Sequence, residues 1–303
     1  MKMVNKDALN SAYRFIKSNC DDLHTSRFDY HFFNRSVDTV LKNLKKYQNE
    51  DGGFGHGLEP DFMLPDSSPM ATTIAFQILD DIGEKNNEMA ASAVKYYENS
   101  FDRKRNGWWA VPAQVNDHPH APWWNYDDQK KCTVIDNHWG NPSSEIIGTL
   151  YEYGSEVRSL DIENLLGHAI NHLNELKEYG SEHEIYCYIR MYKKLPEIYQ
   201  RKLKGTIPKA IKDLVCLDVG KWDTYVPKPL DFVQSRHHPF FADIKEYMEE
   251  NCDYLVDSMN NGIWHPTWNW GQYEDHWEES RKNWIAILTI KNYKILREFD
   301  RLA

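Results

Sequence analysis

Apolar residues recur along most of the chain at intervals of three and four, the spacing that places them on one face of an α-helix. Between Ala8 and Cys20, for example, they fall at Leu9, Ala12 and Ile16. The strict alternation that is typical of strands is scarce, so the pattern predicts an all-α fold. The predicted helices span residues 8–20, 37–47, 70–82, 87–100, 143–153, 162–179, 183–194, 198–204, 209–216, 239–259 and 277–299.

Two of these helices carry strong start signals. Ser68 precedes Pro69, and Asn141 precedes Pro142. A side-chain oxygen at the N-cap followed by proline at the first helical position is typical of a helix N-terminus. We therefore expect helices to begin at both prolines.

A short loop element recurs between the helical segments. Aromatic residues stand two positions after a glycine at Gly52–Phe54, Gly107–Trp109, Gly220–Trp222 and Gly262–Trp264. A repeat of roughly 50 residues suits two helices and a loop. Helical hairpins repeated in this way stack, and such a stack can close into a ring around a cavity.

The first copy of this element carries a family resemblance. The segment from Tyr47 to Gly55, with Gln48 before the glycines and Phe54 after them, resembles the QW-type repeat of squalene/oxidosqualene cyclases and protein prenyltransferases. The resemblance implies a single domain over residues 1–303, an α/α toroid of about six helical hairpins around an aromatic-lined cavity. It also implies an enzyme that binds a small molecule there, an isoprenoid being one candidate, although one fold hosts many chemistries.

The composition argues against a nucleic-acid partner and against a membrane span. Charged residues make up 27% of the chain and the net charge is −10, with no long Lys/Arg block. Sequence-independent nucleic-acid binding needs a positive surface, so we expect no nucleic-acid partner. No apolar run approaches the roughly 20 residues of a membrane span, and residues 1–10 lack an apolar signal-peptide stretch. We expect a cytoplasmic protein; the sequence leaves its oligomeric state open.

The cysteines and histidines indicate neither a metal nor a cofactor. The five cysteines are never within four residues of one another, and their odd number excludes a complete set of disulfides. The Asp-x-Cys pair that holds zinc in prenyltransferases is absent, and the adjacent His237 and His238 are typical of a solvated loop. No phosphate-binding glycine loop, nicotinamide fingerprint or haem motif is present, so we expect no cofactor.

One candidate acid follows from the family resemblance. Residues 125–128 resemble the D-x-D-D motif of class II terpene cyclases, with asparagine in the first position. Asp127, with Asp128 beside it, would then be the catalytic acid, and Trp123 and Trp124 would line its cavity. Such an acid must be kept protonated by burial or by a neighbouring carboxylate.

A second carboxylate cluster follows the strongest repeat. Gly55 and Gly57 flank His56, and Pro60 separates Glu59 from Asp61. Flexible glycines beside a histidine and two carboxylates make a plausible rim site with a general acid and a general base. We therefore expect Glu59 and Asp61 to be the main acidic groups of the ligand site and His56 to contact the ligand.

Tryptophans gather in a third segment, residues 264–274, where polar residues separate them. The chain has 11 tryptophans, and indole faces with interleaved polar groups are what a sugar pocket needs. The predicted ligand-binding residues in and beyond this segment are Trp109, Trp264, His265, Trp268, Trp270, Tyr273 and Glu274. We expect the loops 51–66, 106–128 and 260–276 to face one cavity.

Three functions stay open from the sequence. The first is an enzyme similar to terpenoid cyclases or prenyltransferases. The second is a carbohydrate-active toroid of the glycoside hydrolase or polysaccharide lyase type, in which two carboxylates flank the bond. The third is a non-catalytic binding protein on the same fold.

Overall fold

The computed structural model describes residues 1–85 and 87–302, and over these residues the fold is all-helical. The residues divide into two compact units, a central unit (Lys45–Leu214) and a terminal unit in which Met1–Leu44 joins Val215–Ala303. The all-α prediction is confirmed. The toroid and the single domain stay predictions. No helix in the described residues is both long and apolar enough to cross a membrane.

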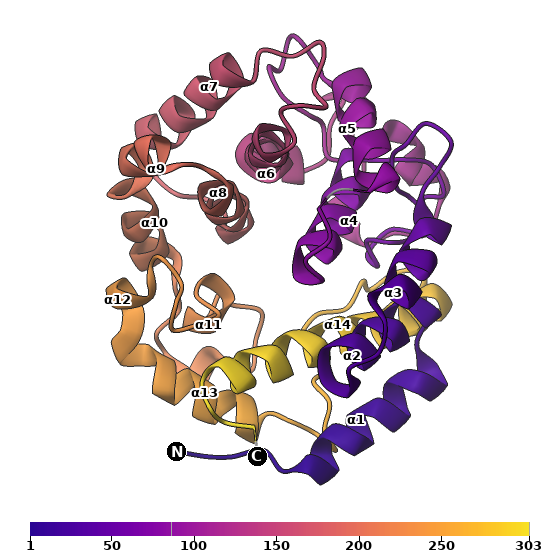
Figure 1. Cartoon of the computed structure of the whole chain (residues 1–303), viewed down its shortest axis with the longest axis vertical. Coiled ribbons are helices and arrows are strands. Elements are labelled where there is room, and N and C mark those ends of the chain that lie inside the picture. The colour runs from indigo at the N-terminus through magenta and orange to yellow at the C-terminus, as the bar shows by residue number, and fades with distance from the viewer. Residues whose placement is uncertain (86, 303) are drawn as a thin grey trace. The chain divides into compact units, whose positions relative to one another are not determined.

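The central unit is built from two layers of helices. Helix α6 packs between α4 and α8, while α5, α7, α9 and α10 pack against these three as a second layer (Figure 1). Nearly every residue of the first three turns of α6 is buried, as expected of a helix with neighbours on all sides. The helices are α4 (Pro69–Asp81), α5 (Glu88–Ser100), α6 (Gly140–Glu152), α7 (Ile162–Glu175), α8 (Glu182–Lys194), α9 (Glu197–Leu203) and α10 (Thr206–Leu214).

In the terminal unit the long C-terminal helix α14 packs against α1 and α2. Its helices are α1 (Lys6–Asn19), α2 (Asp22–Phe33), α3 (Val37–Leu44), α11 (Pro229–Phe232), α12 (Phe241–Ile244), α13 (Met248–Asp257) and α14 (Glu274–Glu298). The predicted helix over residues 239–259 is broken into α12, a short 3-10 turn and α13.

Helix α2 is one element that the apolar pattern missed, and the four-residue α11 is another. Its buried face includes His24 and Ser26 beside Leu23 and Phe28, so polar residues occupy positions where the pattern requires apolar ones. The Ser26 hydroxyl donates to the carbonyl of Leu23, which satisfies it inside the fold. Because polar residues with hydrogen-bond partners can be buried, the apolar residues of this helix do not show its period in the sequence.

The predicted helix start at Pro69 is confirmed, whereas α6 begins at Gly140, two residues before Pro142. The Ser68 side chain accepts a hydrogen bond from the Ala71 amide, with Pro69 at the first helical position. At the second site Asn141 has non-helical backbone angles before Pro142, but its side chain accepts the Cys187 thiol rather than capping the helix.

The recurrent loop is a structural anchor. In three copies the backbone N–H of a buried aromatic residue donates to a hydroxyl on the following helix. Phe54 donates to Thr72 at 3.1 Å. Trp108 donates to Ser143 at 3.0 Å, and Trp264 donates to Thr289 at 3.2 Å.

The indole N–H groups of this element also have fixed partners. That of Trp108 donates to the Tyr97 carbonyl on the preceding helix, and that of Trp264 to the Leu255 carbonyl. In the second copy the anchoring ring is therefore Trp108, one position earlier than the sequence spacing suggested.

We predict that the anchor carries a large share of the stability of the central unit. Trp108 is fully buried, so Trp108→Ala removes its packing and leaves the Tyr97 carbonyl with only the longer bond of 3.4 Å from the Ser100 hydroxyl. We expect a loss of about 3–5 kcal/mol in the free energy of unfolding, measured by chemical denaturation. Trp123→Ala, at a half-buried tryptophan of the same unit, is the control and should cost clearly less. Equal losses would contradict the anchor.

Candidate functional site

The loop that carries Glu59 and Asp61 leaves and re-enters the fold through a narrow neck. Phe54 pairs with Ser68 in an antiparallel bridge, and the Gly55 amide donates to the Tyr47 carbonyl. A Cβ atom at Gly55 would lie 2.3 Å from the carbonyl oxygens of both Pro65 and Asp66. Only glycine fits here, so the neck fixes where the loop begins and ends.

The Gln48 side chain closes the base of this neck. Its amide nitrogen donates to the Gly52 carbonyl at 2.8 Å and to the Met89 carbonyl at 3.0 Å. Gly52 has φ of +92° and its Cα faces the Ser92 carbonyl, so a side chain there would clash. The motif that carries the family resemblance thus has a structural role in this chain.

The tip of the loop is pinned against a second loop, residues 118–125. The Ala121 amide donates to the Asp61 carbonyl and the Met63 amide to the Pro119 carbonyl, both at 2.8 Å. The rings of Phe62 and Trp124 meet edge to face with centroids 5.0 Å apart. The predicted loops 51–66 and 106–128 therefore do meet within the central unit.

Glu59 and Asp61 form a buried acidic pair. Their exposed fractions are 6% and 5%. Within the described residues, Glu59 accepts hydrogen bonds only from the Asp61 amide, at 3.2 and 3.3 Å. Burial, followed by the charge of the neighbouring Asp61, raises the pKa of the Glu59 carboxyl well above its usual range. A glutamate in this setting holds its proton to a higher pH than an ordinary glutamate does, which is the property that a general acid needs.

The other candidate acid has the opposite environment. Asp127 lies in an exposed turn and accepts the amides of Gln129 and Lys130, with the Lys130 ammonium 3.4 Å away. These backbone bonds lower the pKa of its carboxyl. The cyclase acid that the resemblance suggested needs a protonated group, whereas Asp127 is ionised; Asp128 beside it is also exposed.

The aromatic residues predicted around this acid are distributed differently. Trp124 is buried against Phe62, and Trp123 is half-buried. The Trp109 indole N–H donates to the Asp102 carboxylate at 3.0 Å, and the Arg105 guanidinium lies 4.2 Å from the centroid of the Trp109 ring. Arg105 and Trp109 stabilise the loop, so Trp109 has a structural explanation.

His56 stands at the exposed rim of the loop. Its Nε2 lies 2.8 Å from the Asn49 side-chain oxygen, and its backbone has a positive φ of 56°. Asn49 also lines an open polar groove of about 510 Å³ with residues Glu50, Asp51, Asp66, Ser67, Pro112 and Gln114. His56 and the groove therefore lie on the solvent side of the same loop.

The predicted residues of the 264–274 segment belong to the terminal unit and divide into two groups. Trp264 and Trp270 are buried, and Trp264 is one of the anchors described above. The exposed or half-buried group comprises His265, Trp268, Tyr273 and Glu274. That this segment faces the same cavity as the Glu59 loop stays a prediction.

Other buried acids of the central unit, which the sequence did not single out, are fully paired. Glu145 accepts the Gln77 amide at 2.9 Å and the Arg190 guanidinium at 3.1 Å. Asp136 accepts the amides of Ala110 and Thr133 and the Thr133 hydroxyl. Their oxygens are committed to structural bonds, which distinguishes them from Glu59.

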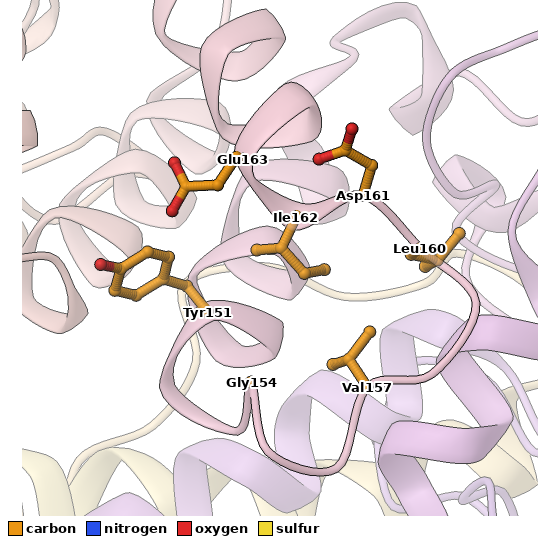
Figure 2. A pocket seen from close by; sticks show the side chains of 7 residues that line it. All are labelled: Tyr151, Gly154, Val157, Leu160, Asp161, Ile162 and Glu163. Carbon is orange, nitrogen blue, oxygen red and sulfur yellow. The ribbon is translucent and has the colours of Figure 1, made fainter.

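A smaller pocket of about 320 Å³ lies where α6 leads into α7 (Figure 2). Tyr151, Val157 and Ile162 line it together with Asp161 and Glu163. Asp161 caps α7 by accepting the Asn164 amide, and Glu163 accepts the Tyr199 hydroxyl. Both carboxylates are thus held by structural bonds.

The chain matches no protein-family model, no curated protein and no solved structure. Within the described residues, no group of histidine, cysteine and carboxylate side chains could hold a metal ion. The candidate site therefore rests on the geometry of its own residues, with the Glu59–Asp61 pair at its centre.

The neck gives a first prediction for this site. Gly55→Ala places a methyl group 2.3 Å from two backbone oxygens, so the backbone must shift, and we expect a loss of about 1–3 kcal/mol in stability. Gly167→Ala, within α7, is the control because no atom lies within 4 Å of its added Cβ. Thermal melts compare the two variants, and an unchanged Gly55→Ala protein would show that the neck is not fixed.

The raised pKa of Glu59 gives a second prediction. The folded protein holds this proton more tightly than the unfolded chain, so the stabilisation is present at low pH and is lost as the pH rises through the folded pKa. Glu59→Gln cannot ionise. Above pH 4.5, the ordinary pKa of glutamate, the free energy of unfolding of Glu59→Gln should therefore rise relative to that of the wild type. The slope of this difference should approach about 1.4 kcal/mol per pH unit.

The measurement is urea denaturation at a series of pH values. Glu50→Gln, at an exposed position of the same unit, serves as the control and should track the wild type. A constant difference between Glu59→Gln and the wild type at all pH values would contradict a raised pKa.

Proposed function

We propose that this protein is an enzyme in which the protonated carboxyl of Glu59 acts as a general acid on a small-molecule ligand. The observation that carries the proposal is the burial of Glu59 beside a second carboxylate, where the Asp61 amide is its only hydrogen-bond donor among the described residues. Positioned acids of this kind typically contribute 10²–10⁴-fold to a rate.

The proton transfer has a simple cycle. Glu59 gives its proton to a double bond or an ether oxygen of the ligand and becomes a carboxylate beside Asp61. The two neighbouring negative charges repel, so Glu59 regains a proton from solvent or from the reacting molecule when the cation is quenched. Ring faces such as those of Phe62 and Trp124 attract a developing cation.

The favoured ligand class is an isoprenoid. Support comes from the resemblance of residues 47–55 to the cyclase repeat and from the two-layer packing of hairpins in the central unit, which suits a complete α/α toroid. On this proposal the ligand is a small molecule, no cofactor takes part, and the predicted location is the cytoplasm.

A carbohydrate-active enzyme is the second candidate. One observation favours it: a carboxyl kept neutral beside another carboxylate is the arrangement with which glycosidases divide the roles of acid and base. Asp61 would then be the base or nucleophile. A protein that binds a ligand without turnover is the remaining possibility on the same fold.

The test is turnover of defined substrates. Farnesyl diphosphate, geranylgeranyl diphosphate and squalene represent isoprenoids, and cellohexaose, xylohexaose and maltohexaose represent glycans. Product formation is followed by mass spectrometry for the wild type, Glu59→Gln, Asp61→Asn and the control Glu178→Gln, at an exposed position of the same unit. We expect Glu59→Gln to lower the rate about 10²-fold or more while the control retains it. Full activity in Glu59→Gln would refute the acid role, and binding without product would identify a binding protein.

A further inference from the structure

Trp268 differs from the anchoring tryptophans of the terminal unit. The indole N–H groups of Trp222 and Trp264 donate to the carbonyls of Cys216 and Leu255. The Trp268 indole nitrogen is also buried but has no acceptor within the described residues. A buried donor without an acceptor costs about 1–3 kcal/mol, so the fold alone does not account for it.

The Trp268 ring is the middle member of an aromatic corner. Tyr225 lies on one side, with centroids 5.5 Å apart, and Trp284 of α14 on the other, at 5.0 Å; both pairs meet at 80°. Tyr225 is 53% exposed, and both tryptophans are only half-buried. Three segments distant in sequence thus present rings to the exterior at one place.

Two side chains beside this corner, Arg281 and His265, carry hydrogen-bond donors. Arg281, one turn before Trp284 on α14, has a buried Nε without an acceptor in the described residues, while its Nη2 is paired with Glu278 at 2.7 Å. Partial burial of its ring, followed by the charge of the Arg281 guanidinium, lowers the pKa of His265. The Arg281–Glu278 pair cancels its own charge, so an uncharged ligand with acceptor oxygens is favoured.

We propose that Tyr225, Trp268 and Trp284, with Arg281 and His265, form a saccharide-binding site in the terminal unit. A pyranose ring presents an apolar C–H face, which stacks on an aromatic ring, and hydroxyl oxygens, which accept from N–H donors. A sugar therefore matches the rings directly, and it reaches the buried N–H groups of Trp268 and Arg281 when the aromatic corner opens around it. This site does not depend on the acid role of Glu59.

The inference is tested by binding on the full chain. Isothermal titration with cellohexaose, xylohexaose and maltohexaose at millimolar concentration gives affinities, and NMR follows the indole N–H signal of Trp268 during the titration. We expect at least one of these sugars to bind and to shift that signal downfield, since a hydroxyl then accepts the free N–H.

Variants separate stacking from hydrogen bonding. Trp268→Phe keeps a ring but lacks the N–H, and we expect binding about three- to tenfold weaker. Tyr225→Ala should weaken it roughly tenfold, while Tyr247→Ala, a tyrosine of the same unit outside the corner, should bind as the wild type does. Thermal melts confirm that each variant is folded. The inference is overturned if none of the three sugars binds, or if Trp268→Phe and Tyr225→Ala bind as the wild type does.

Discussion

The tight neck at Gly55 is the constraint on which the candidate site depends. Two backbone carbonyls approach the Gly55 Cα so closely that no side chain fits. The Phe54–Ser68 bridge joins the two chain segments that form the neck. With its ends fixed, the loop packs its tip against residues 118–125. Glu59 and Asp61 are consequently carried inward, away from the water that would otherwise solvate them.

Burial alone does not make an acid chemically useful; the lack of a compensating partner does. Glu145 and Asp136 are as buried as Glu59, but each accepts hydrogen bonds that use its negative charge to hold the fold. Glu59 has a neighbouring carboxylate in place of a cation, so its charged form is disfavoured twice, by desolvation and by repulsion. This difference separates one site carboxyl from several structural ones.

Much of the fold could be predicted from the sequence, because helices that bury one apolar face display their period directly. Helix α2 could not, since His24 and Ser26 are buried with their bonds satisfied. The anchoring role of the glycine–aromatic loops was also hidden: spacing from glycine selected Trp109, whereas the ring that packs inside is Trp108.

The candidate site was predictable to a similar degree. The glycines around His56 pointed to a constrained loop, and the loop does enclose the acidic pair. The D-x-D-D resemblance pointed to Asp127, which the local turn exposes and pairs with backbone amides. A four-residue pattern gives residue types but neither burial nor bonding partners, and these two together decide whether a carboxyl keeps its proton.

The protonation state of Glu59 can be observed directly. In protein labelled with ¹³C at glutamate Cδ, the Glu59 signal, assigned through its loss in Glu59→Gln, is followed by NMR as the pH is raised. The account predicts that this carboxyl titrates well above 4.5, the ordinary value for glutamate. A midpoint at or below 4.5 would mean that Glu59 is ionised at neutral pH, and it would contradict the proposed general acid.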